Sequence, residues 1–126
     1  MTEEVKRYLQ KAQRSLRVAE ELLAKGYFDD SCSKSYYVMF YAAQALLKKS
    51  GVHVVKHSAV VAKFGEHFVK TGEIDPLFHR YMIDAKQKRE IADYDVFLGI
   101  DRKTAKERIE WAREFLSKIK GRLKNS

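Results

Sequence analysis

Apolar residues recur along the chain at alternating steps of four and three, which is the spacing of one face of an α-helix. The first stripe lies between Thr2 and about Lys25, and it consists of Val5, Leu9, Ala12, Leu16, Ala19 and Leu23. Thr2 can cap the start of this helix, and Gly26 can end it. We therefore predict a long amphipathic helix at the start of the chain.

The second predicted helix, from about Asp29 to Ser50, has an apolar surface wider than one stripe. One set of residues is Cys32, Tyr36, Met39, Ala43 and Leu46, and a second set is Tyr37, Phe40, Tyr41 and Leu47. A helix that is apolar on two sides is either central in its bundle or shared with another subunit. We predict a subunit interface that includes Tyr36, Tyr37, Phe40 and Tyr41.

Three further helices complete the pattern. A short one is expected from about Ser58 to Lys70, and a long one opens at Asp75-Pro76 and runs to about Phe97. The last opens with a capping box at residues 104–107 and carries the stripe Ala105, Ile109, Ala112, Leu116, Ile119 and Leu123. Short connections make neighbouring helices antiparallel. The fold class is therefore all-α, an antiparallel up-down bundle of four long helices plus one short helix, in a single domain spanning 1–126.

Length and composition restrict the size of the domain and the compartment in which we expect it. The chain of 126 residues has room for one core, and no apolar run of membrane-spanning length occurs in it. The charged N-terminus lacks the apolar stretch of a signal peptide, and Cys32 is the only cysteine, so we expect a cytoplasmic protein without an internal disulfide.

The net charge of +8 is unevenly spread, because residues 101–126 hold nine Lys/Arg against four Asp/Glu. A basic surplus favours nucleic acid or an acidic protein as partner, and a solvated basic helix explains the same surplus. Both interpretations stay open.

One position breaks the apolar pattern. The inward stripe of the fourth helix reads Phe78, Met82, Ala85, Arg89, Ala92 and Val96, so Arg89 stands where leucine is expected. A guanidinium keeps its charge, and inside a core it needs an anionic partner, which Asp93 one turn later can supply. Arg89 is then either a structural clamp or a phosphate-binding group with Asp93 and Tyr94 beside it. We expect only this helix to place a fixed charge on its stripe.

Other candidate residues carry weaker signals. The four histidines form no zinc-binding pattern, so we predict no metal and no cofactor. Cys32 lies on an apolar stripe, which is typical of a small core residue. His57-Ser58 begins the third helix, where free backbone N–H groups and a titratable ring could bind an anion. An ordinary helix start explains this pair equally well.

Four motifs in this chain resemble those of the HEPN superfamily of small prokaryotic helical proteins. They are SYYVMFYAAQALL at residues 35–47, the pair His57-Ser58, the stretch from Phe64 to Gly72, and Arg-Glu-Ile-Ala-Asp-Tyr at residues 89–94. The motifs fall in the family's order and cover nearly the whole chain. The chain looks most like the subfamily with an Arg-x-x-Ala-Asp-Tyr motif.

The resemblance implies a helical bundle that forms a homodimer. Members are often encoded beside a minimal nucleotidyltransferase, with which they form a two-protein module of toxin–antitoxin type. Ribonuclease members carry Arg-x4-6-His at a cleft across the dimer, where the histidine suits acid–base work on the 2′-OH of RNA.

This sequence departs from the ribonuclease motif. Counted from Arg89, the positions for the histidine hold Tyr94, Asp95 and Val96. Tyrosine, with a pKa of about 10, is a poor base at neutral pH, and an ordinary aspartate is a weak one. The arginine half of the motif therefore carries over, whereas the histidine half does not, and we lean towards a protein that is not an enzyme.

Three hypotheses follow for the function. The first is a dimeric binding protein partnered with a minimal nucleotidyltransferase-like protein in a toxin–antitoxin-type module. The second is a metal-independent ribonuclease in which Arg89 binds the scissile phosphate and Asp93, Tyr94 or His57 assists. The third is binding of a nucleotide or an RNA phosphate without turnover. The binding residues common to these hypotheses are Arg89, Asp93, Tyr94, His57 and Ser58.

Overall fold

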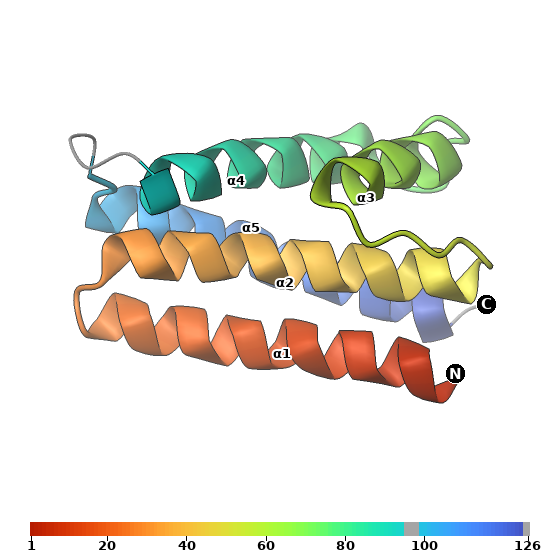
Figure 1. The fold of residues 1–126 in the computed structure, drawn as a ribbon, viewed down its shortest axis with the longest axis horizontal. Coiled ribbons are helices and arrows are strands. Elements are labelled where there is room, and N and C mark those ends of the chain that lie inside the picture. The colour runs from red at the N-terminus through yellow and green to blue at the C-terminus, as the bar shows by residue number, and fades with distance from the viewer. Residues whose placement is uncertain (95–98, 125–126) are drawn as a thin grey trace.

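The computed structural model describes residues 1–94 and 99–124. Its long helices are α1 (Glu3–Ala24), α2 (Phe28–Lys49), α4 (Pro76–Tyr94) and α5 (Arg102–Lys124), and the short α3 (His57–Phe64) continues into a π-helical turn, η1 (Gly65–Val69). The four long helices run alternately in opposite directions (Figure 1), which confirms the predicted up-down bundle. The expected continuation of the fourth helix to Phe97 lies outside the described residues.

Glycine follows each of the first two helices, at Gly26 as the sequence predicts and at Gly51 after α2. Gly26 and Gly51 adopt φ values of +83° and +84°, a region that a side chain disfavours. After α1 the N–H of Tyr27 donates to the carbonyl of Leu22 at 2.9 Å, and after α2 the N–H of Val52 donates to the carbonyl of Leu47 at 2.9 Å. These bonds satisfy carbonyl groups that the helix leaves open.

The start of α5 differs from the prediction. The capping box at Thr104 is wrong, because α5 already begins at Arg102 and Thr104 lies in its first turn. The N–H of Thr104 donates to Oδ1 of Asp101 at 2.8 Å, and the N–H of Ala105 donates to the carbonyl of Asp101 at 3.1 Å. Asp101 therefore caps the helix, since an aspartate serves this position at least as well as a threonine.

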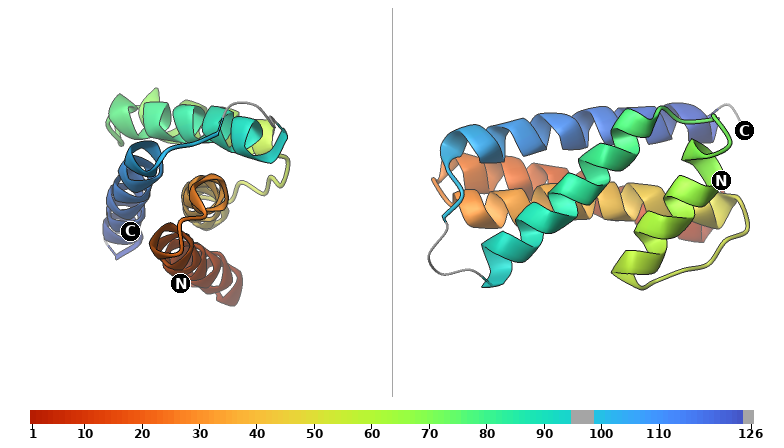
Figure 2. Two further views of the ribbon diagram at one scale, coloured as in Figure 1. Left: turned by 90° about the vertical axis from the view of Figure 1, so that its left-hand side faces the viewer. Right: turned by 90° about the horizontal axis from the view of Figure 1, so that it is seen from above.

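Helix α2 lies at the centre of the bundle. Viewed along the bundle axis, α1, α4 and α5 surround it (Figure 2, left). Its wide apolar surface is buried against all three, with Tyr36, Val38, Met39 and Leu47 fully enclosed. A central position thus accounts for most of the width that the sequence predicted for this helix.

The turn η1 packs closely against α4 at Gly65, where the ring of His79 lies next to the glycine. A Cβ added at Gly65 would lie 2.6 Å from Cε1 of His79, closer than real side chains approach. The imidazole occupies this space, and its Nε2 lies 3.0 Å from the carbonyl oxygen of Val61, to which it donates. The close approach fixes the start of α4, which then crosses α2 obliquely (Figure 2, right).

Within the described part of the chain, no helix combines the length and apolar character needed to cross a membrane.

Candidate functional site

The predicted partners Arg89 and Asp93 form an ion pair on α4. Nε of Arg89 lies 3.1 Å from Oδ2 of Asp93, and the two side chains are 17% and 32% exposed. The hydroxyl of Ser33 on α2 donates to Oδ1 of Asp93 at 3.2 Å. The carboxylate therefore links α2 to α4 and holds the arginine at the junction of these helices.

The guanidinium of Arg89 also lies over two tyrosine rings of α2. Its Cζ is 5.7 Å from the ring centroid of Tyr36 and 5.7 Å from that of Tyr37, within the range of a cation–π contact. Burial by itself would lower the pKa of Arg89, but Tyr37 and then Asp93 and Tyr94 raise it above its usual value. The guanidinium of Arg89 therefore stays charged, paired with the carboxylate of Asp93.

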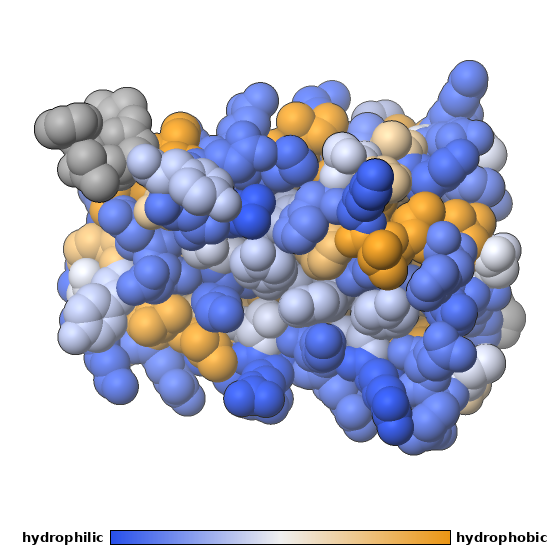
Figure 3. Space-filling model, in the orientation of Figure 1, coloured by the Kyte–Doolittle hydropathy of each residue, from blue (hydrophilic) through white to orange (hydrophobic). Residues whose placement is uncertain are grey.

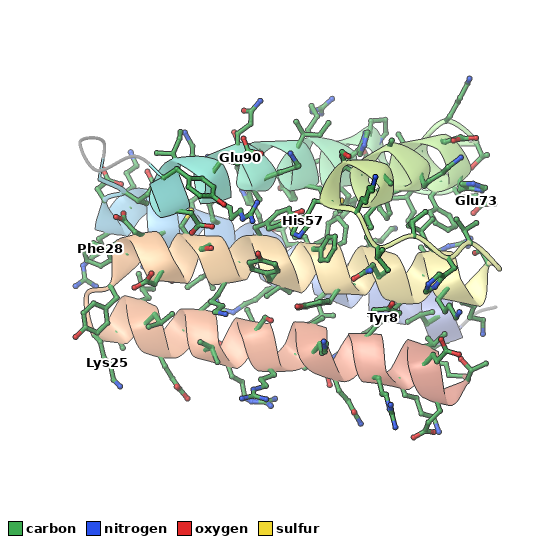
Figure 4. All side chains as sticks on the ribbon, in the orientation of Figure 1. Tyr8, Lys25, Phe28, His57, Glu73 and Glu90 are labelled. Atoms are coloured by element: carbon green, nitrogen blue, oxygen red, sulfur yellow. The ribbon has the colours of Figure 1, made fainter. Side chains whose placement is uncertain are left out.

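His57, at the start of α3, lies against the same rings. Its imidazole stacks on Phe40, with 4.3 Å between centroids, and its centroid lies 5.6 Å and 5.8 Å from those of Tyr36 and Tyr37. Figure 4 labels His57 between α2 and the start of α3. His57 and Arg89 are thus brought together across two tyrosines, although 32 positions separate them in the sequence.

A buried phenol lies within hydrogen-bond distance of His57. Oη of Tyr36 lies 2.7 Å from Nδ1 of His57. Burial raises the pKa of Tyr36, so the phenol keeps its proton at neutral pH, and it donates to Nδ1 in the tautomer whose ring proton is on Nε2. Burial, with the positive charges of Arg89 and Lys86, lowers the pKa of His57. In the tautomer with its proton on Nε2, the neutral ring accepts from Tyr36 and offers a hydrogen-bond donor at Nε2.

The remaining predicted site residues that the structure describes, Tyr94 and Ser58, are more exposed than Arg89 and His57. Tyr94 ends α4 with 76% of its surface exposed. Ser58 is exposed and lines a groove of about 390 Å³ between α3 and α4, together with Lys86 and Glu90. Asp95 and Val96, which follow Tyr94, lie outside the described residues. The pair His57-Ser58 is therefore split, with the ring turned to α2 and the hydroxyl beside a groove.

The predicted interface residues divide in the same way. Tyr36 and Phe40 are 0% and 5% exposed within a single chain, whereas Tyr37 and Tyr41 are half-buried and reach the surface. The Nζ atom of Lys34 lies 5.7 Å from the ring of Tyr37 and that of Lys11 lies 5.2 Å from the ring of Tyr41. The interface stays a prediction. Of the four residues predicted for it, Tyr37 and Tyr41 are the two whose side chains are partly exposed.

Sequence reasoning missed a second buried arginine. The side chain of Arg108 on α5 is 6% exposed, less than that of Arg89, so the expectation that only the fourth helix places a charge on its stripe is wrong. Its Nη2 lies 2.6 Å from Oδ1 of Asp84, and its Cζ lies 4.1 Å from the ring centroid of Trp111. The sequence does place Trp111 three positions after Arg108, on the same face of the helix, and this spacing could have indicated the contact between the two side chains.

Cys32 lies near this arginine and is fully buried, as expected of a core residue. Burial raises the pKa of its thiol to about 11, so the thiolate that nucleophilic chemistry requires is scarce at neutral pH.

Comparison with known proteins identifies relatives along nearly the whole chain. A family model described as HEPN domain matches residues 5–122. "Putative toxin MJ0142" of Methanocaldococcus jannaschii is 34% identical over 117 residues, which cover 93% of this chain and 80% of that protein. "Putative toxin MJ0605" of the same organism is 30% identical over 125 residues, which cover 97% of this chain and 90% of that one.

A solved structure shares the fold. The crystal structure of TT1696 from Thermus thermophilus superposes with a TM-score of 0.81 over 95% of this chain and 98% of that one, at 16% sequence identity. At this identity the likeness concerns the arrangement of the helices alone.

Proposed function

The chain belongs to the HEPN domain family, and on that premise we propose that it is the toxin-side component of a two-protein toxin–antitoxin module. In this proposal it is a homodimeric binding protein of the cytoplasm whose partner is a minimal nucleotidyltransferase-like protein. The two relatives whose names describe them as putative toxins support this assignment. The run Arg-Glu-Ile-Ala-Asp-Tyr at residues 89–94 supports our proposal that it belongs to the subfamily with that motif.

The observation that carries a binding role is the state of His57 beside Arg89. We assign the tautomer in which Nδ1 accepts from Tyr36 and Nε2 carries the ring proton, and in it the imidazole donates a hydrogen bond and has no free lone pair for taking a proton. Arg89 adds a permanent charge against the same rings. Two donors of this kind suit the oxygens of a phosphate group in a nucleotide or an RNA.

The phosphate part of the proposal is tested by binding. Affinity for a short RNA or a nucleotide is measured with the wild type, Arg89→Ala and Arg80→Ala, the last being an exposed arginine of the same helix. We expect Arg89→Ala to lose at least about tenfold, the scale of a charge-assisted contact, and Arg80→Ala to keep its affinity. Equal affinity of the three proteins would contradict a phosphate site at Arg89.

The dimer is tested by light scattering at micromolar concentration. We expect a mass of two chains, and we expect the double variant Tyr37→Ser/Tyr41→Ser to shift the protein towards the monomer. The control is Tyr27→Ser, since Tyr27 is an exposed tyrosine that directly precedes α2. A monomeric wild type would refute the homodimer.

The second candidate function is that of a metal-independent ribonuclease. It is favoured by one observation, a neutral histidine next to an arginine that can hold the scissile phosphate. Turnover would require Tyr36 to accept from Nδ1–H, so that Nε2 becomes a base. The test is incubation with a broad set of RNAs without metal, using the wild type, Arg89→Ala and His57→Gln. Cleavage that both substitutions abolish would establish the ribonuclease, and absence of cleavage in all three would refute it.

A further inference from the structure

The exposed face of α1 is basic and contains no acid along its middle. Residues 6–17 carry five cations and neither Asp nor Glu, and all five are exposed: Lys6, Arg7, Lys11, Arg14 and Arg17. In the orientation of Figure 1, α1 forms the lower margin of the molecule, which is hydrophilic along its length in Figure 3. The sequence prediction of a basic surface concerned the C-terminal segment and overlooked this one.

The positive charge of this face is not neutralised within the fold. The acids of α1 lie at its two ends, where Glu4 pairs with Lys48 at 3.1 Å and Glu20 pairs with Arg113 at 2.7 Å. Among residues 1–94 and 99–124, no carboxylate forms an ion pair with any of the five central cations of α1. Their charges therefore stay without a carboxylate partner there, although Nζ of Lys11 also lies 5.2 Å from the ring centroid of Tyr41.

Helix α5 carries more cations but offers a less uniform face. Three of its arginines are engaged in ion pairs, Arg108 with Asp84, Arg113 with Glu20 and Arg122 with Glu73. Its exposed lysines are also interrupted by three exposed glutamates, Glu107, Glu110 and Glu114. Acids between cations weaken the attraction for a polyanion, so α1 is the better candidate for such a contact.

A shallow groove on α1 adds an aromatic ring to these charges. It has a volume of about 270 Å³ and is lined by Glu4, Arg7, Tyr8 and Lys11. The ring of Tyr8 is half-buried, and Figure 4 labels this residue on α1 near its N-terminal end. A ring flanked by cations is the combination that binds single-stranded nucleic acid, where bases stack on the ring and phosphates contact the cations.

We propose that the α1 face binds single-stranded nucleic acid, with phosphates at Arg7, Lys11 and Arg14 and a base against Tyr8. An anionic membrane is a poorer fit, because the apolar stripe of α1 is buried in the bundle at Val5, Ala12 and Ala19 and cannot insert. This surface is separate from Arg89 and does not depend on the function proposed for that site.

The test is the salt dependence of binding to a labelled single-stranded RNA of mixed sequence. The variant Arg7→Gln/Lys11→Gln removes two charges from α1, and Lys103→Gln/Lys106→Gln removes two exposed charges from α5. We expect the α1 variant to bind more weakly and to lower the slope of log K against log salt by about 1.4, since each phosphate contact on a single strand contributes about 0.7. The α5 variant is expected to keep the wild-type slope.

The stacking contact is tested by Tyr8→Leu, which keeps an apolar side chain in place. We expect this variant to bind RNA about tenfold more weakly, the scale of one lost base stack, with its salt slope unchanged. Equal losses in the α1 and α5 variants would overturn the proposal, as would a wild type that binds phosphatidylserine vesicles but no RNA. Arg89→Ala separates the two proposals. If RNA binding persists in Arg89→Ala and falls in Arg7→Gln/Lys11→Gln, the α1 face is supported and the Arg89 site is not.

Discussion

Oη of Tyr36 lies 2.7 Å from Nδ1 of His57, which joins the centre of α2 to the first residue of α3 across 21 positions of sequence. Removing this hydroxyl in Tyr36→Phe leaves Nδ1 without its hydrogen-bond partner and keeps the ring in the core. We expect the free energy of unfolding to fall by about 1–2 kcal/mol, as for a lost buried hydrogen bond. Urea denaturation measures this change, and Tyr27→Phe is the control at an exposed tyrosine. Equal stability of the two variants would contradict the bond.

The histidine also makes stability depend on pH. Burial, followed by Arg89 and Lys86, lowers the pKa of His57 in the folded chain, so the unfolded chain binds the proton more readily. This contribution to stability is fully present above the unfolded pKa of about 6.5 and is lost as the pH falls through and below that value.

We expect His57→Gln to flatten this part of the stability profile, with His53→Gln as the matched control in an exposed loop position. Measuring the urea denaturation midpoint of each variant between pH 5 and pH 8 tests this expectation. A His57→Gln profile as steep as that of the wild type would show that another group is responsible.

Two glycines offer a paired test of the π-helical turn. Gly65→Ala would place a methyl group 2.6 Å from Cε1 of His79, whereas a Cβ at Gly121 meets nothing within 4 Å. We expect Gly65→Ala to destabilise the fold by about 1–3 kcal/mol through overpacking. Gly121→Ala lies within α5 and is expected to stabilise it by about 0.5–1 kcal/mol. Thermal unfolding of both variants measures the contrast, and changes of the same sign would contradict it.

We expect the pair of buried Arg108 and partly exposed Asp84 to respond unequally to the loss of either partner. Asp84→Ala leaves a nearly buried guanidinium with the exposed Glu107 as its remaining carboxylate, which we expect to cost about 1–3 kcal/mol. Arg108→Met replaces the cation by an apolar side chain of similar length and leaves Asp84, which is 38% exposed, accessible to water. We therefore expect Arg108→Met to be the milder change in urea denaturation, and the reverse order would contradict this account.

The long helices were predictable because each stripe is a local pattern. Val5, Ala12 and Ala19 are buried as the steps of four and three require. The start of α5 was misplaced because Asp101 and Thr104 are both good caps, and the sequence does not show which of them the preceding connection brings to the first free N–H groups.

The site was predictable only where its parts lie one helical turn apart. Arg89 and Asp93 are such a pair, so the ion pair follows from sequence spacing. The contact of His57 with Tyr36 depends on how α3 returns over α2, which no local pattern encodes. Arg108 was overlooked for the same reason, because its partner Asp84 comes from another helix.

We propose that this chain acts through Arg89 as the toxin-side component of a module, and inducible expression in a bacterial host tests this proposal most directly. Growth is followed for the wild type, Arg89→Ala and Arg80→Ala at matched soluble levels. We predict that the wild type and Arg80→Ala slow growth and that Arg89→Ala does not. Growth unaffected by the wild type, or slowed equally by Arg89→Ala, would contradict the account.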